Sequence, residues 1–189
     1  RDTKKEAKKY DKDGYVVFAG SLPMKNQLDK SYRLQSETDD EGFPKWIIAN
    51  GTALGQTQGA AEMQATELAK LRLVGLLETN MRSVVESDVS NSQLSATDAT
   101  SVQKTIEVAT NRVAKKLTRV MPLFKVHKNI KKNVEVKVQI GYNYDLAKKA
   151  MLDEMRLILE EETEDVRKKH DAFLNPDKYR SGEIKNYSG

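Results

Sequence analysis

The sequence predicts an α+β fold: a small antiparallel sheet of about four strands with two to three long helices packed on one face. Three features lead to this expectation. A strand-like segment, Trp46–Leu54, runs directly into a helical pattern, and a second helical pattern follows a serine-rich loop. Residues 134–142 then alternate between apolar and polar side chains. One layer of helices on a small sheet would bury the apolar faces of all these segments.

The composition indicates one domain with a modest core beneath a charged surface. Of the 189 residues, 38% are hydrophobic and 32% are charged, and the apolar residues are periodic, which argues against a disordered chain. We expect residues 1–13 to form a charged tether or frayed helix, residues 14–169 a single α+β domain, and residues 170–189 an irregular tail. No apolar run is long enough to predict a transmembrane segment.

The first half of the chain contains two predicted strands separated by a polar excursion. Tyr15–Ala19 is a continuous apolar run ended by Gly20, which is typical of a short buried strand. Residues 21–45 are mostly polar, with a short helix after Pro23 and an acidic turn before Trp46–Leu54. The sheet therefore receives two strands from this half.

A long helix is predicted from about residue 58 to residue 87. Ala61, Ala65 and Ala69 recur at a spacing of four and form a smooth ridge against which a sheet or a second helix can pack. Core packing is the simpler interpretation, and self-association through the ridge is the alternative. The glycines of Gly51–Gly55 fit a tight crossing of helix over strand, because the segment lacks the Gly-Lys-Ser/Thr ending of a phosphate loop.

The second half predicts a helix, a hairpin and a final helix. Ser95 and Asp98 resemble the start of a capping box, and apolar residues then recur every three or four positions until Pro122 ends the helix. A strand, a lysine-rich turn at 129–133 and the alternating strand 134–142 follow, the second strand with one face in water. Asp145 is the expected cap of the final helix.

The residues do not predict a catalytic or metal centre. The chain has no cysteine, which excludes disulfides, thiolate ligands and cysteine nucleophiles. Its two histidines, His127 and His170, lack a nearby carboxylate or histidine at ligand spacing. The acidic runs 37–41 and 160–165 lack the spacing of a calcium loop. We therefore expect no enzyme activity, no metal and no cofactor, and an enzyme would require a cleft that gathers acids or histidines from separate elements.

A basic stretch is the best candidate site. Between Glu107 and Glu135 there are eight basic residues and no acid. If the helix and the hairpin present these side chains on the same side of the molecule, the side chains form an anion-binding patch. The alternative is a solvated helix face together with a lysine-rich hairpin edge that discourages pairing with strands of other molecules. Apart from Phe124 the stretch has no aromatic residue, which argues against stacking on nucleic-acid bases. The eight are Arg112, Lys115, Lys116, Arg119, Lys125, Lys128, Lys131 and Lys132.

The chain resembles the LPP-twenty lipoprotein family of small bacterial envelope proteins, which include flagellar outer-membrane components. The resemblance covers roughly residues 46–155 and rests on Trp46-Ile-Ile-Ala-Asn-Gly-Thr-Ala53, the alanine ridge, and the strand 134–140 followed by Asp145–Ala150. It implies a protein without enzymatic activity that is periplasmic or anchored at the outer membrane; if the protein is anchored, the lipid would be on a cysteine upstream of Arg1. The segment 14–45, the second strong helix and the region beyond 160 depart from the family pattern.

Two functions are therefore expected. The first is a non-enzymatic envelope interaction or assembly protein, whose partners are other envelope proteins or a second copy of itself. The second is an anion-binding module that uses the basic stretch to hold nucleic acid, anionic lipid or anionic glycan, with nucleic acid the least favoured of the three.

Overall fold

The computed structural model describes residues 2–160, 164–171 and 173–175 of the chain. In this part of the chain the secondary structure follows the predicted order, with α6 in addition. In chain order the elements are α1 (Thr3–Lys12), β1 (Val16–Val17), α2 (Met24–Ser36), β2 (Trp46–Gly55), α3 (Gln58–Ser90), α4 (Ala96–Lys116), β3 (Met121–Ile130), β4 (Asn133–Asn143), α5 (Tyr144–Leu159) and α6 (Glu164–Asp171).

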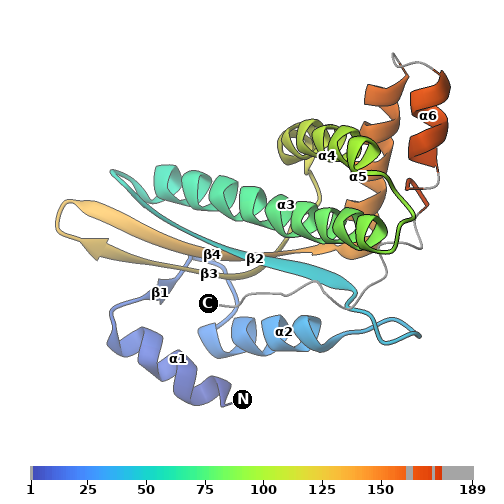
Figure 1. Ribbon diagram of the computed structural model, residues 1–189. Coiled ribbons are helices and arrows are strands. Elements are labelled where there is room, and N and C mark those ends of the chain that lie inside the picture. Colours follow the sequence, from blue (N-terminus) through green and yellow to red (C-terminus); the bar gives the residue numbers. More distant parts are fainter. Residues whose placement is uncertain (1, 161–163, 172, 176–189) are drawn as a thin grey trace.

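The four strands form one antiparallel sheet in the order β1-β3-β4-β2, which confirms the α+β fold (Figure 1). β3 and β4 are the two arms of a hairpin, and β2 pairs with β4 along its whole length, from Trp46 opposite Asn143 to Gly55 opposite Val134. β1 is an edge strand of only two residues, and Val16 is 49% exposed, so the predicted buried strand at residues 15–19 is wrong. Tyr15 and Phe18 on either side supply the burial instead.

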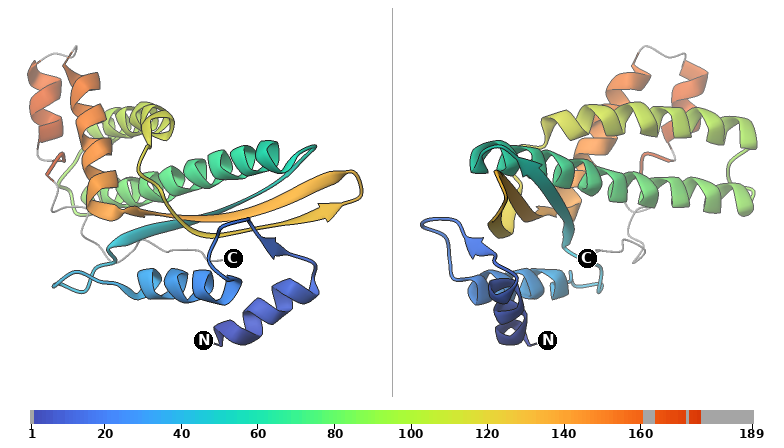
Figure 2. Two further views of the ribbon diagram at one scale, coloured as in Figure 1. Left: turned by 180° about the vertical axis from the view of Figure 1, so that it is seen from behind. Right: turned by 90° about the vertical axis from the view of Figure 1, so that its left-hand side faces the viewer.

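Helices cover both faces of the sheet. α3 packs over β2 and β4, α4 packs on the side of α3 away from the sheet, and α5 rises from the end of β4 to pack on α4 (Figures 1 and 2). α1 and α2 lie beneath the opposite face, which was wrongly predicted to face water (Figure 2). Ser31 of α2 donates a hydrogen bond to the side chain of Gln139 on β4, and both residues are buried. A polar face can therefore be covered when the covering helix supplies matching polar groups.

The alanine ridge of α3 lies inside the monomer. Ala61, Ala65 and Ala69 are 0% exposed. A Cβ added to Gly51 would lie 2.0 Å from the carbonyl oxygen of Ala65, and one added to Gly55 would lie 2.9 Å from the backbone nitrogen of Ala61. Small residues on both elements thus let the two backbones approach closely. In this arrangement the ridge faces β2 and is not available to a partner.

Residues 2–13 are a packed part of the fold, which corrects the expectation of a tether or a frayed helix for residues 1–13. Asp2 caps α1, and the Thr3 hydroxyl donates to Asp29 of α2 at 2.5 Å. The ring of Tyr10 lies 5.0 Å from that of Phe124 and 5.7 Å from that of Tyr15. The buried side of α1 carries few apolar residues, so a count of hydrophobic side chains does not reveal it.

The predicted start of the tail at residue 170 is wrong. His170 and Phe173 are 1% exposed, and Phe173 and Leu174 belong to the main hydrophobic core. Arg156 of α5 donates to the carbonyl of Leu174 at 3.3 Å. Residues 176–189, the rest of the predicted tail, lie outside the described residues.

The helix ends agree with the sequence in one case and differ in two. The Ser95 hydroxyl accepts from the Asp98 amide at 3.1 Å, as predicted. α5 is capped by Asn143 instead of Asp145. α4 ends at Lys116, before Pro122, because residues 117–120 carry the chain from the helix layer down to β3. Arg119 therefore does not share a helix face with Arg112.

Candidate anion-binding site

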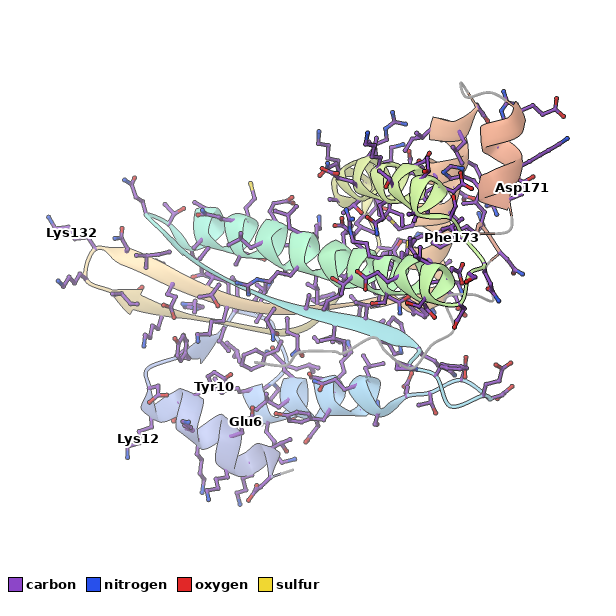
Figure 3. The ribbon with its side chains drawn as sticks, viewed as in Figure 1. Glu6, Tyr10, Lys12, Lys132, Asp171 and Phe173 are labelled. Carbon is purple, nitrogen blue, oxygen red and sulfur yellow. The ribbon has the colours of Figure 1, made fainter. Side chains whose placement is uncertain are left out.

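The predicted basic patch is divided between two ends of the molecule. Arg112, Lys115 and Lys116 lie on α4, whereas Lys131 and Lys132 form the turn of the β3–β4 hairpin. Figure 3 shows Lys132 at the hairpin tip, far from the α4–α5 layer. The ten residues of β3 account for this distance, since a strand rises about 3.3 Å per residue. The eight residues do not form a single surface.

The basic residues of α4 are partly occupied by an acid of α5. Glu154, whose side chain is 8% exposed, forms an ion pair with Lys116 and lies 3.9 Å from Arg112. A buried carboxylate needs such partners, because leaving it unpaired is costly. These two side chains therefore help to hold α4 against α5, and Lys115 remains exposed.

Lys125 on β3 also has a structural role. Its ammonium group lies 2.7 Å from a carboxylate oxygen of Glu62 on α3 and 4.5 Å from the ring centre of Phe18. It connects the sheet to α3 and to the segment after β1.

The hairpin end brings lysines from three segments around one pocket of about 400 Å³. Lys128 on β3 and Lys137 on β4 lie over the ring of Tyr15, with ammonium nitrogens 4.5 Å and 5.3 Å from the ring centre. Lys128 also donates to the backbone carbonyl of Asp13 at 3.3 Å, and Lys9 reaches the pocket from α1. The pocket is lined by Glu6, Lys9, Tyr10, Asp13, Tyr15, Lys128 and Lys137.

Tyrosine hydroxyls engage two of the nearby carboxylates. Tyr15 donates to Glu135, and Tyr32 donates to Glu6 at 2.5 Å. Within the described part of the chain, no carboxylate oxygen lies within 4.0 Å of the ammonium groups of Lys9, Lys128 or Lys137. These three ammonium groups can therefore turn to an anion that enters the pocket.

The protonation state of Tyr15 supports this arrangement. Burial, together with the hydrogen bond to Glu135, raises the pKa of Tyr15 well above its ordinary value. The hydroxyl thus stays protonated near neutral pH and keeps donating to the carboxylate. The neutral ring then holds the two lysines by cation–π contacts without cancelling their charge.

α1 adds a basic face that the sequence analysis missed. Figure 3 shows Glu6 and Tyr10 on the side of the helix toward the sheet and Lys12 pointing away from it. The signal was present in the spacing, since positions i, i+1, i+4, i+5 and i+8 share one side of a helix. The exposed lysines at these positions are Lys4, Lys5, Lys8, Lys9 and Lys12.

The backbone conformation of the hairpin turn can be tested by substitution with glycine. Lys131 has φ 56°, in the left-handed region that disfavours side chains with a Cβ, whereas Lys132 does not. We expect Lys131→Gly to raise the free energy of unfolding by about 0.5 to 1 kcal/mol, and Lys132→Gly to give no gain. Urea denaturation of both variants measures this, and an equal effect of the two would contradict the turn geometry.

The histidines and the acidic turn of residues 37–41 lie apart in the fold. The ring of His127 on β3 lies 5.0 Å from that of Phe18, while His170 is buried at the end of α6, on the other side of the molecule. In the acidic turn, the Asp39 carboxylate accepts from the amides of Glu41 and Phe43. Among the described residues, no group of three or more histidines, cysteines and acids is placed to hold a metal ion. Part of the acidic run 160–165 lies outside the described residues.

Two further findings bear on the identity of the protein. Over the described residues, none of the helices has the length and apolar character needed to span a membrane. Comparison of the chain with protein-family models, with curated proteins and with solved structures finds no match.

Proposed function

We propose that the protein is a non-enzymatic binding and assembly protein of the bacterial envelope that holds phosphate-bearing anions at its hairpin end. The observation that carries the binding role is the pocket in which Lys9, Lys128 and Lys137 meet without a carboxylate partner among the described residues. The placement in the periplasm or at the outer membrane rests on the resemblance to the LPP-twenty lipoproteins.

The pocket suits a phosphate group for two reasons. Ammonium groups on flexible stems bind phosphate oxygens as point charges, and several of them can surround one group. Its volume of about 400 Å³ lies in the range of small-ligand sites. Glu6 and Asp13 also line the pocket, so the site should prefer a compact, strongly charged anion that reaches the lysines over a weakly charged one.

The same end of the molecule serves the assembly role. Lys131 and Lys132 at the hairpin tip and the exposed lysines of α1 add positive charge outside the pocket, which attracts anionic partners over a distance set by the salt concentration. Self-association through the alanine ridge is not part of this proposal, because the ridge lies against β2.

The test compares two variants with the same change in net charge. In Lys128→Gln/Lys137→Gln we expect the dissociation constant for inositol hexakisphosphate, measured by calorimetry at low salt, to rise by roughly tenfold or more. The control Lys104→Gln/Lys115→Gln removes two exposed lysines of α4 and should change it less than about twofold. Equal losses in both variants would mean that the attraction comes from net charge alone and would contradict the pocket.

A further inference from the structure

The side of α1 that faces away from the pocket carries a second hollow, and this hollow is apolar. A groove of about 410 Å³ lies between α1, β1 and the start of α2. Val16, Val17 and Met24 form its apolar wall, and Lys4, Lys8 and Lys25 line it as well. Both hollows therefore flank one lysine-bearing helix.

Two aliphatic side chains of the segment from β1 to α2 are exposed. Val16 lines the groove and is 49% exposed, and Leu22, three residues before Lys25, is 53% exposed and lines a separate hollow. Among the groove's charges, Lys25 is ion-paired with Asp29 at 2.8 Å and Asp11 also lines the groove, whereas Lys4 and Lys8 have no carboxylate partner in the described part of the chain. The surface thus combines free positive charge with apolar atoms in water.

From this combination we infer that the anionic partner of the hairpin end is a lipid bilayer. The inference rests on the proposed function and deepens it. Ammonium groups bind headgroup phosphates, while aliphatic side chains gain by entering the boundary between headgroups and acyl chains. A soluble polyanion or a nucleic acid would satisfy the lysines but would leave Val16 and Leu22 in water. The bilayer is the one anionic partner that uses both parts of the surface.

The orientation of α1 fits this docking. Its five exposed lysines occupy positions that share one side of the helix, so α1 can lie parallel to a membrane plane with that side toward the headgroups. Both hollows adjoin this helix, since Lys4 and Lys8 line the groove together with Val16, and Lys9 lines the pocket that would receive a phosphate group.

The experiment measures co-sedimentation of the full chain with phosphatidylcholine vesicles that contain or lack phosphatidylglycerol. We expect binding to the anionic vesicles only, and we expect Val16→Gln/Leu22→Gln to weaken it at least fivefold. The control Leu146→Gln/Leu157→Gln changes two aliphatic residues of α5 that are 50% and 48% exposed, and should bind as the wild type does. Inositol hexakisphosphate binding, measured on the same samples, should be equal in all three proteins.

Each other outcome is decisive. If the wild type binds inositol hexakisphosphate but no vesicle, the membrane inference is wrong and the proposed function stands. If vesicle binding is the same with and without Val16→Gln/Leu22→Gln, the docking surface is wrong. If the wild type binds neither ligand, the proposed function fails and the inference fails with it.

Discussion

Gly51→Ala is expected to destabilise the protein severely. The new methyl carbon would lie 2.0 Å from the carbonyl oxygen of Ala65 and 2.9 Å from the backbone nitrogen of Ala69, and neither backbone atom can move unless α3 lifts from the sheet. Such overpacking should lower the free energy of unfolding by about 3 kcal/mol or more. That is a large part of the roughly 5 to 15 kcal/mol that stabilises a typical domain. Urea denaturation followed by circular dichroism measures the change.

A second glycine of the same unit provides the control. Gly75 lies within α3, and a Cβ added there meets nothing within 4 Å. Gly75→Ala should therefore raise the free energy of unfolding by roughly 0.5 to 1 kcal/mol, because alanine is the better helix former. If the two substitutions shift the urea midpoint in the same direction, the close crossing of α3 over β2 is wrong.

A substitution in the alanine ridge of α3 tests the same contact between α3 and β2 from the helix side. Ala65 is 0% exposed, so Ala65→Glu places a carboxylate in the core without a partner, and we expect no folded protein. A folded monomer that has lost a wild-type oligomer, detected by analytical ultracentrifugation, would instead identify the ridge as an interface between copies.

Phe173→Ala is the second change with a large expected effect. Phe173 is 1% exposed and packs in the main core, although it lies in a stretch without any helical or strand periodicity. Removing its ring should lower the free energy of unfolding by about 3 to 5 kcal/mol, the usual loss for a fully buried phenylalanine. Thermal denaturation of the purified variant measures this.

The matched control is Phe43→Ala. Phe43 is only partly buried in the acidic turn. Its backbone amide donates to the side-chain carboxylate of Asp39, and the substitution leaves this hydrogen bond intact. We expect a loss of less than about 1.5 kcal/mol there. Equal stability of Phe173→Ala and the wild type would show that residues 170–175 are a tail, as the sequence alone suggests.

Elements with strong local periodicity were predicted from the sequence, for a physical reason. The helices at Gln58–Ser90 and Ala96–Lys116 repeat apolar residues every three or four positions, and β4 alternates strictly, so each pattern matches only one backbone geometry. Gly51 and the alanine ridge likewise indicate a close crossing before any contact is known. The spacing of apolar residues was sufficient for these elements because all residues of each buried face belong to one continuous segment of the chain.

The candidate site depended on contacts that local patterns do not contain. The basic residues of α4 and those of the hairpin turn are close in sequence but far apart in space, because the ten-residue strand β3 lies between them. Lys9 meets Lys128 and Lys137 although more than a hundred residues separate them in the chain. Which lysines remain without an acid depends on Tyr15 and Tyr32, whose hydroxyls engage Glu135 and Glu6.

The sequence by itself therefore determined the fold class, the main helices and the close packing of α3 on β2, because periodicity and residue size act within each segment. The tertiary structure alone decided that α1 is a packed helix, that the C-terminal core extends to Leu174, and where the unpaired positive charge gathers. Charge pairing depends on distance in space, and only the folded chain sets that distance.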